Sequence, residues 1–173
     1  IGSPKGGEAQ LEYAKRLEAG IGVTRDVKEA EVWYRSALNR ENEEAQYRLG
    51  ELLINEKPGN ESIAEALVLL KKSADAGRYE AQLELGRYLY QNKKLNRARD
   101  AEILLGKASA GKLNSEATLY LANIYIVGAV NQPNHPKAKQ VLERIMNEPG
   151  QYSQAAHYLL GMMYLKGSFG PDS

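Results

Sequence analysis

The side chains best suited to catalysis are two histidines and a large set of carboxylates. His135 stands among prolines in an expected loop, and His157 follows Ala156 on an expected helix. A catalytic triad or a metal site needs a histidine at a defined spacing from a nucleophile or further ligands, and neither histidine has such partners. Cysteine is absent, the 22 acidic residues show no spacing that singles out a pair, and no glycine-rich phosphate loop occurs. We therefore expect no enzyme activity, no metal site and no cofactor.

A different set of side chains recurs along the chain at a nearly constant interval. Alanine stands at positions 9, 45, 81, 117 and 156, so successive copies are 36, 36, 36 and 39 residues apart. The segments that begin there are alike and read AQLEYAK, AQYRLGE, AQLELGR, ATLYLAN and AHYLLGM. A period of this length is typical of a solenoid of stacked helical hairpins. The repeat therefore predicts an all-α binding scaffold.

Each copy contains two amphipathic segments with helical spacing. The first has small or apolar residues four, five and eight positions after its alanine, as at Leu49, Gly50 and Leu53. The second has its own alanine, at position 30, 66, 101 or 138, with large side chains three and four residues later. The fifth position of the first segment is small in four copies, where it is Gly50, Gly86, Ala122 or Gly161. Because glycine inside a helix costs roughly 1 kcal/mol relative to alanine, we expect a neighbouring helix to approach closely there.

The ends of these helices carry recognisable signals. Asp26 is expected to cap the helix that starts near Val27, and Pro136 suits a first helical turn. Gly20 and Gly77 stand where a helix should end, because glycine accepts the left-handed conformation found there.

Copy one carries the most regular version of the pattern. Its second half contains Gly20, Ile21, Gly22, Val23, Asp26, Lys28, Ala30, Trp33, Tyr34 and Ala37. These residues, with the repeated alanine and Leu-Gly signature, resemble the Sel1-like repeats, a branch of the tetratricopeptide-type superfamily. Copies two to four keep the signature but have degenerate loops and lack the Trp-Tyr pair. The resemblance implies an α/α right-handed superhelix (solenoid) of helical hairpins that holds proteins together.

The repeat boundaries follow from this pattern. We expect repeats at residues 8–43, 44–79, 80–115 and 116–154, and the first helix of an incomplete fifth at 155–170. Residues 1–7 are expected to be a linker or the end of a preceding repeat, and residues 171–173 a tail. A loop at 164–172 lies where a second helix would follow, so the chain is expected to be a fragment of a longer protein.

In a superhelix of this type, the first helix of each hairpin lines the concave face. Positions one before and two, six and nine after the alanine point away from the buried stripe. We call these positions the first-helix face: Glu44, Tyr47, Glu51, Ile54, Glu80, Leu83, Arg87, Tyr90, Glu116, Leu119, Asn123, Ile126, Tyr158 and Met162. They predict a groove with an apolar floor, in which Tyr47, Leu83, Tyr90 and Tyr158 are accessible, and a row of glutamates along one edge.

Other interpretations of these residues stay open. Tighter coiling of the superhelix would pack the side chains of the first-helix face into the core. Separately, Trp33 is expected to pack between hairpins. The glutamates stand near helix starts, where a carboxylate stabilises the helix dipole, but they also suit a basic partner. The groove fits a peptide, a helix or a protein loop with aromatic anchors. Carbohydrate contact, and a role as a regulatory subunit of an enzyme, are the alternatives.

Composition narrows the partners and leaves the compartment open. The net charge is +1 with no long basic run, so we expect no nucleic-acid binding. No apolar stretch is long enough to span a bilayer, although a lipid anchor upstream stays compatible with the sequence. We expect a monomer or weak self-association. The resemblance points to a bacterial envelope or signalling complex, and the degenerate loops are similar to those of periplasmic lipoproteins of alginate and other exopolysaccharide export. A cytoplasmic location is the alternative.

Overall fold

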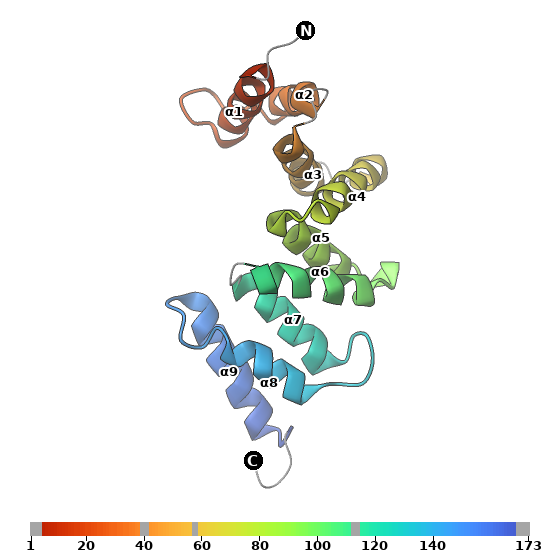
Figure 1. The fold of residues 1–173 in the computed structure, drawn as a ribbon, viewed down its shortest axis with the longest axis vertical. Helices are drawn as coiled ribbons and strands as arrows, with labels where there is room; N and C mark the ends of the chain where they lie inside the picture. Colours follow the sequence, from red (N-terminus) through yellow and green to blue (C-terminus); the bar gives the residue numbers. More distant parts are fainter. Residues whose placement is uncertain (1–4, 39–41, 57–58, 112–114, 169–173) are drawn as a thin grey trace. The chain divides into compact units, whose positions relative to one another are not determined.

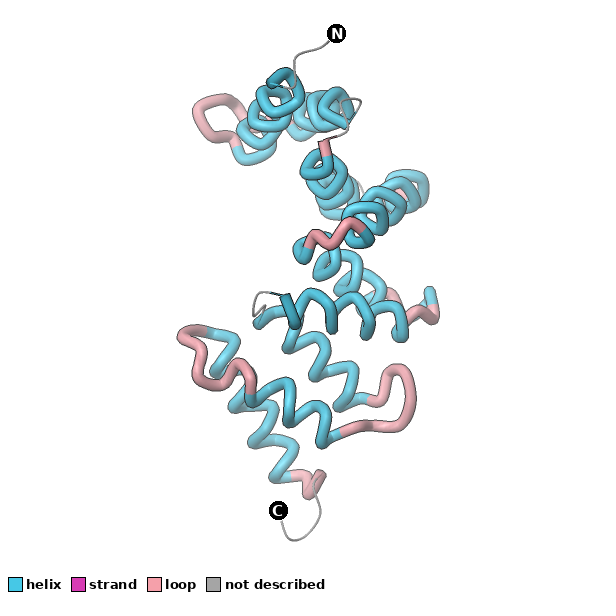
Figure 2. The backbone as a smooth tube through the Cα atoms, in the orientation of Figure 1, coloured by secondary structure: helices cyan, strands magenta, loops and turns pink. Residues whose placement is uncertain are grey.

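The computed structural model describes residues 5–38, 42–56, 59–111 and 115–168, which form helices joined by loops (Figures 1 and 2). The helices are α1 (Lys5–Ala19), α2 (Val27–Leu38), α3 (Glu43–Glu56), α4 (Asn60–Asp75), α5 (Tyr79–Gln91), the 3₁₀ helix η1 (Lys93–Leu95), α6 (Ala98–Gly111), α7 (Ser115–Val127), α8 (His135–Glu143) and α9 (Gln151–Leu165). No strand occurs within the described ranges. The predicted all-α class is confirmed, and the chain divides into two compact units, Ile1–Ala81 and Gln82–Ser173.

The first unit consists of two helical hairpins. α1 packs along α2, α3 packs along α4, and α2 contacts α3 (Figure 1). The core is built from alanines and leucines, among them Leu49, Leu52 and Leu53. Ala30, Ala45 and Ala66, which begin the predicted stripes, are fully buried. A side chain of one methyl group lets the helices pack closely at these points, and the leucines then fill the space beside them.

The second unit repeats this construction. α7 packs against α6 and α8, and α9 contacts α7 and α8. Its core includes Ala122, Leu142, Ile145 and Leu160. The stripe alanines at positions 101, 117, 138 and 156 are all fully buried, as is Ala81, the last residue of the first unit. The stripes predicted for both helices of copies two to four therefore lie in the cores.

The small residue five positions after the repeat alanine has the predicted role in two copies. A Cβ atom added to Gly50 would lie 2.8 Å from Leu70 Cγ and 3.3 Å from the Ala66 carbonyl oxygen. A Cβ atom added to Gly86 would lie 2.8 Å from Leu105 Cγ. Each glycine therefore leaves space on the first helix, and a leucine of the second helix in the same hairpin packs into it. We call this space the leucine seat. Around Gly161, at the same position of α9, no described atom lies within 4 Å of such a Cβ.

The predicted helix ends also agree with the structure. The Asp26 carboxylate accepts a hydrogen bond of 2.9 Å from the Glu29 backbone N–H at the start of α2. Asn134 caps α8 by accepting from the Lys137 N–H at 3.0 Å, and Pro136 lies in the first turn. Gly20 and Gly77 end their helices with φ angles of +70° and +95°, the region that favours glycine.

One expectation for the first copy needs correction. Ala9 is exposed, because α1 turns Leu11, Ala14 and Leu17 into the core in place of its repeat alanine. Trp33 is partly buried against the core that both hairpins of the first unit share, and its ring meets Tyr13 edge-on at a centroid distance of 5.4 Å. α1 begins at Lys5, within the residues 1–7 that were expected to be a linker or the end of a preceding repeat. Residues 1–4 and the tail at 171–173 lie outside the described residues.

Candidate protein-binding surface

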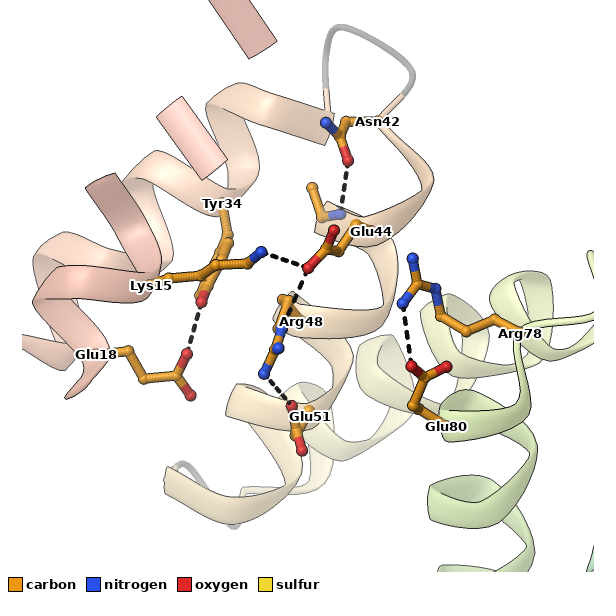
Figure 3. Close-up of polar contacts among 10 residues, drawn as sticks. Lys15, Glu18, Tyr34, Asn42, Glu44, Arg48, Glu51, Arg78 and Glu80 are labelled. Carbon is orange, nitrogen blue, oxygen red and sulfur yellow. Dashed lines mark hydrogen bonds and ion pairs between the residues drawn. The ribbon is translucent and has the colours of Figure 1, made fainter. Parts of the chain in front are cut away.

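In the first unit, the first-helix face is a network of charges. Lys15 on α1 pairs with Glu44 on α3, with its Nζ 2.5 Å from Oε1. Arg48 lies one turn further along α3, 3.7 Å from Glu44 and 3.3 Å from Glu51 (Figure 3). Acid and base therefore alternate along α3, and the Lys15 pair ties α3 to the preceding hairpin.

A second pair extends the network beyond α4. Arg78 Nη1 lies 3.7 Å from Glu80 Oε1 (Figure 3). Two of the predicted glutamates, Glu44 and Glu80, thus have cationic partners inside the protein. Their side chains keep 31% and 33% of their surface exposed, so both carboxylates stay within reach of a partner.

Tyr47 is not the accessible floor residue that the sequence predicted. Its side chain is 8% exposed. The guanidinium carbons of Arg48 and Arg78 lie 5.4 Å and 5.6 Å from its ring centroid. Both cations lie over the ring, an arrangement in which cation–π attraction adds to the burial of the ring. The charged network therefore covers the aromatic ring in place of leaving it open to a ligand.

Beneath the network, Tyr34 joins α2 to α1. Its hydroxyl donates to the Glu18 carboxylate at 2.6 Å (Figure 3), and the side chain is fully buried. Burial raises the pKa of Tyr34 above its usual value, and the hydrogen bond to Glu18 raises it further. The phenol stays neutral and donates one hydrogen bond, which fixes the position of α2 behind the network.

The charges around Glu44 predict a pH-dependent stability. Burial by itself would raise the pKa of Glu44, but the hydrogen bond and charge of Lys15, with Arg78 and Arg48, lower it below its ordinary value of 4.5. A lowered folded-state pKa stabilises the protein above the ordinary pKa, and this stabilisation disappears as the pH falls through the lower value. We expect Glu44→Gln to lower the unfolding temperature at neutral pH and to have a shrinking effect below about pH 4.5.

Thermal unfolding followed by circular dichroism across this range checks the prediction. Glu43→Gln is the matched control, because Glu43 is exposed on the same helix turn and makes no ion pair with any residue that the structure describes. The control should keep the pH profile of the wild type. If Glu44→Gln lowered the unfolding temperature by the same amount at neutral pH and at acidic pH, this result would contradict the role of the Lys15 pair.

In the second unit, the first-helix face is partly polar and partly aromatic. Arg87 on α5 is held by the buried Glu84 carboxylate, with Nη2 2.5 Å from Oε1. The ring of Tyr90 meets the ring of Tyr120 edge-on at 6.0 Å. Asn123 donates to the Leu119 carbonyl at 3.1 Å within α7. These contacts fix the side chains. Burial by itself would lower the pKa of Arg87, but the hydrogen bond and charge of Glu84, with smaller contributions from Tyr120 and Glu116, raise it above its ordinary value.

The apolar members of the face divide between core and surface. Leu119 and Ile126 pack against the core of the second unit, and Ile54 packs against the core of the first. These three side chains are partly buried, between the open floor and the fully packed core that the sequence left as alternatives. Leu83, Tyr90 and Met162 are half-buried, and Tyr158 on α9 is 67% exposed. Of the four side chains predicted to be accessible, Tyr158 is the most open and Tyr47 the least.

Both histidines make a hydrogen bond to a backbone carbonyl. His135 Nδ1 donates to the Ser168 carbonyl at 3.1 Å, and His157 Nδ1 donates to the Ser153 carbonyl one turn earlier at 2.9 Å. Within the described ranges, no group of three histidine or acidic side chains is arranged to hold a metal ion. The same ranges contain no helix with the length and apolarity needed to cross a membrane.

Comparison with protein families identifies the repeat. The sequence pattern described as the Sel1 repeat matches residues 7–42, 43–77, 80–92 and 154–172, which is more than half of the chain. The chain belongs to the Sel1 repeat family. Sel1 repeats generally serve as non-catalytic scaffolds for protein interactions. The first two matched segments coincide closely with the first two predicted repeats, whereas copies three and four, with their degenerate loops, match only over 80–92.

Two solved structures have the same fold as this Sel1 repeat chain. One is c5321, a protective antigen of uropathogenic Escherichia coli that displays an SLR fold, with 24% identity and a TM-score of 0.77 over 88% of the chain. The other is a Sel1 repeat protein from Oxalobacter formigenes, with 20% identity and the same TM-score over 96% of the chain. The chain spans 33% of the first structure and 68% of the second. No curated protein sequence matches it.

Sequence reasoning missed the residues that make the network in the first unit. Arg48 lies three positions after the repeat alanine, outside the positions assigned to the face, and Arg78 lies in a loop. One signal was present: Glu44, Arg48 and Glu51 have the four- and three-residue spacings at which side chains meet on a helix. The contacts with Lys15 and Tyr47 depend on the packing of separate hairpins, which no local spacing indicates.

Proposed function

We propose that this chain is a non-catalytic scaffold that binds protein partners through the first-helix face. In the first unit the partner contacts the alternating charges of α3 and its neighbours. In the second unit it contacts Arg87, Tyr90 and Tyr158. A partner with both acidic and basic side chains complements the first unit better than the basic partner that the glutamates alone suggest.

The observation that carries the proposal is the charge network. Its members are held in place by one another, yet Glu44, Arg48 and Glu51 keep 31%, 36% and 26% of their side-chain surfaces exposed. Partly exposed charges that are already ordered lose little conformational freedom when a partner binds. Their alternating signs also favour one register of a complementary surface over others.

Site-specific photo-crosslinking tests the proposal. A photoreactive amino acid is placed in the full chain at Glu51 or Tyr158, and the labelled proteins are irradiated in extracts of the source cells. Val68 on α4 and Ile103 on α6 are the control positions, because both are exposed apolar side chains on second helices. We expect discrete protein adducts from Glu51 and Tyr158 and none from the controls. Adducts formed only from Val68 and Ile103 would place binding on the second helices and reject the proposal.

A narrower version of the proposal sets the scaffold in a bacterial envelope complex for alginate or other exopolysaccharide export, as a periplasmic protein. It rests on the degenerate loops and uneven repeat lengths of copies two to four. Fractionation of the source cells with an antibody to the chain tests it. Recovery in the periplasmic or outer-membrane fraction would support this version, whereas recovery in the cytoplasm would reject it and leave the scaffold proposal standing.

A further inference from the structure

A pocket of about 290 Å³ opens at one end of the helices of the second unit. It lies between the end of α5, the 3₁₀ helix η1, the start of α6 and the end of α7, which Figure 1 draws in yellow-green to turquoise. Leu89, Tyr90, Ala98 and Val127 supply apolar walls, and Lys93 and Arg97 stand among the lining residues. Its volume is near the lower end of the range for ligand pockets, so it suits one inserted side chain.

Two walls of the pocket differ in how they are supported and exposed. The ring of Tyr90 is held by the edge-on contact with Tyr120 at 6.0 Å. Val127 is 57% exposed at the end of α7, so apolar surface there is left in contact with water. An apolar side chain that fills the pocket would remove this surface from water, which is favourable.

The charged side chains that line the pocket are basic. The segment at residues 93–99 contains Lys93, Lys94, Arg97 and Arg99 and no carboxylate. Arg97 is held by Asp100, with its Nε 2.6 Å from Oδ2, and no acidic side chain lines the pocket. Lys93 makes no ion pair with any residue in the described part of the chain. A ligand beside the pocket therefore meets unneutralised positive charge.

We propose that this pocket binds an acidic segment of a partner protein, which inserts one apolar side chain between Tyr90 and Val127 and places its carboxylates beside Lys93. The charge selects the acidic segment, and the apolar walls distinguish it from a nucleic acid or a simple anion. The pocket is a site separate from the charge network of the first unit. This binding mode rests on the proposed function, since it assumes that the chain binds proteins.

The test uses the full chain and a fluorescein-labelled peptide of aspartates and glutamates around one central leucine, followed by fluorescence anisotropy. We expect binding that weakens as salt is added. Lys93→Glu should lower the affinity roughly tenfold, and Val127→Asp should lower it as well. Lys107→Glu is the matched control, because it makes the same charge change at an exposed position of α6 that does not line the pocket. It should lower the affinity much less than Lys93→Glu.

Four results would overturn the pocket proposal. They are no binding by the wild type, equal weakening by Lys107→Glu and Lys93→Glu, equal affinity for a peptide with glycine in place of leucine, and equal affinity for a peptide with lysines in place of the acidic residues. Any of them would leave the proposed function intact if crosslinks still form at Glu51 and Tyr158. Loss of those crosslinks with retained peptide binding would instead reject the first-helix face and keep the pocket.

Discussion

Replacing Leu70 by alanine should lower the free energy of unfolding by about 2–5 kcal/mol, the range for deleting a fully buried leucine side chain. Leu70 has no exposed surface, and its side chain fills the seat that Gly50 leaves on α3. The surrounding helices cannot collapse fully into the space, so a cavity term adds to the lost burial. Chemical denaturation followed by the helical circular dichroism signal measures the change.

Val68→Ala is the matched control for Leu70→Ala, since Val68 is on the same helix but 68% exposed. Alanine has the higher helix propensity, so this change should stay within about 0.5 kcal/mol of neutral. Equal losses from the two variants would mean that α4 does not pack through Leu70.

Gly128→Ala should be among the most damaging single-methyl changes in the second unit. Gly128 has a φ of +64°, and an added Cβ would lie 2.6 Å from the Pro133 nitrogen and 2.7 Å from the Asn131 carbonyl oxygen. The left-handed conformation costs alanine roughly 1–2 kcal/mol. Forcing the loop backbone apart adds about 1–3 kcal/mol, the usual range for overpacking. Chemical denaturation should therefore show a loss of roughly 2–5 kcal/mol.

Gly167 separates these two contributions to the Gly128 effect. Its φ is +65°, nearly the same, but nothing lies within 4 Å of an added Cβ among the described atoms. Gly167→Ala should therefore cost only the conformational part, roughly 1–2 kcal/mol. If the two alanine variants were equally stable, the crowding at Gly128 would have no energetic consequence.

The hairpins were predictable because their signals are local and repeated. An alanine with small residues five positions later marks a helix face through the 3.6-residue period alone. The same pattern occurs in several copies, so it can still be recognised when one copy deviates from it. The exception is Ala9, where α1 buries Leu11, Ala14 and Leu17. The contacts of one helix with its neighbours, which decide this choice, are not encoded in the period of that helix.

The surface was less predictable, because exposure depends on side chains from other helices. The period of α3 places Tyr47 away from the core stripe, but it carries no information about Arg78, which lies over the ring. Leu119 and Ile126 lie against the core of the second unit for the same reason. The pocket depends on η1 and on Asn96, which has a φ of +50°, and neither belongs to the repeat pattern.

Both proposed binding surfaces depend on hairpins that are held together through leucines seated on aligned small residues. The double-mutant cycle of Gly50→Ala and Leu70→Ala tests this packing most directly. Gly50→Ala alone should destabilise the protein by about 1–3 kcal/mol, while Gly161→Ala, at the same repeat position but in open space, should be neutral or stabilising. In the Leu70→Ala background the Gly50→Ala penalty should fall by at least about 1 kcal/mol, which is the coupling free energy, and the remainder reflects the 3.3 Å approach to the Ala66 carbonyl oxygen. Additive effects of the two substitutions would contradict the leucine seat and the helix packing within the hairpin that depends on it.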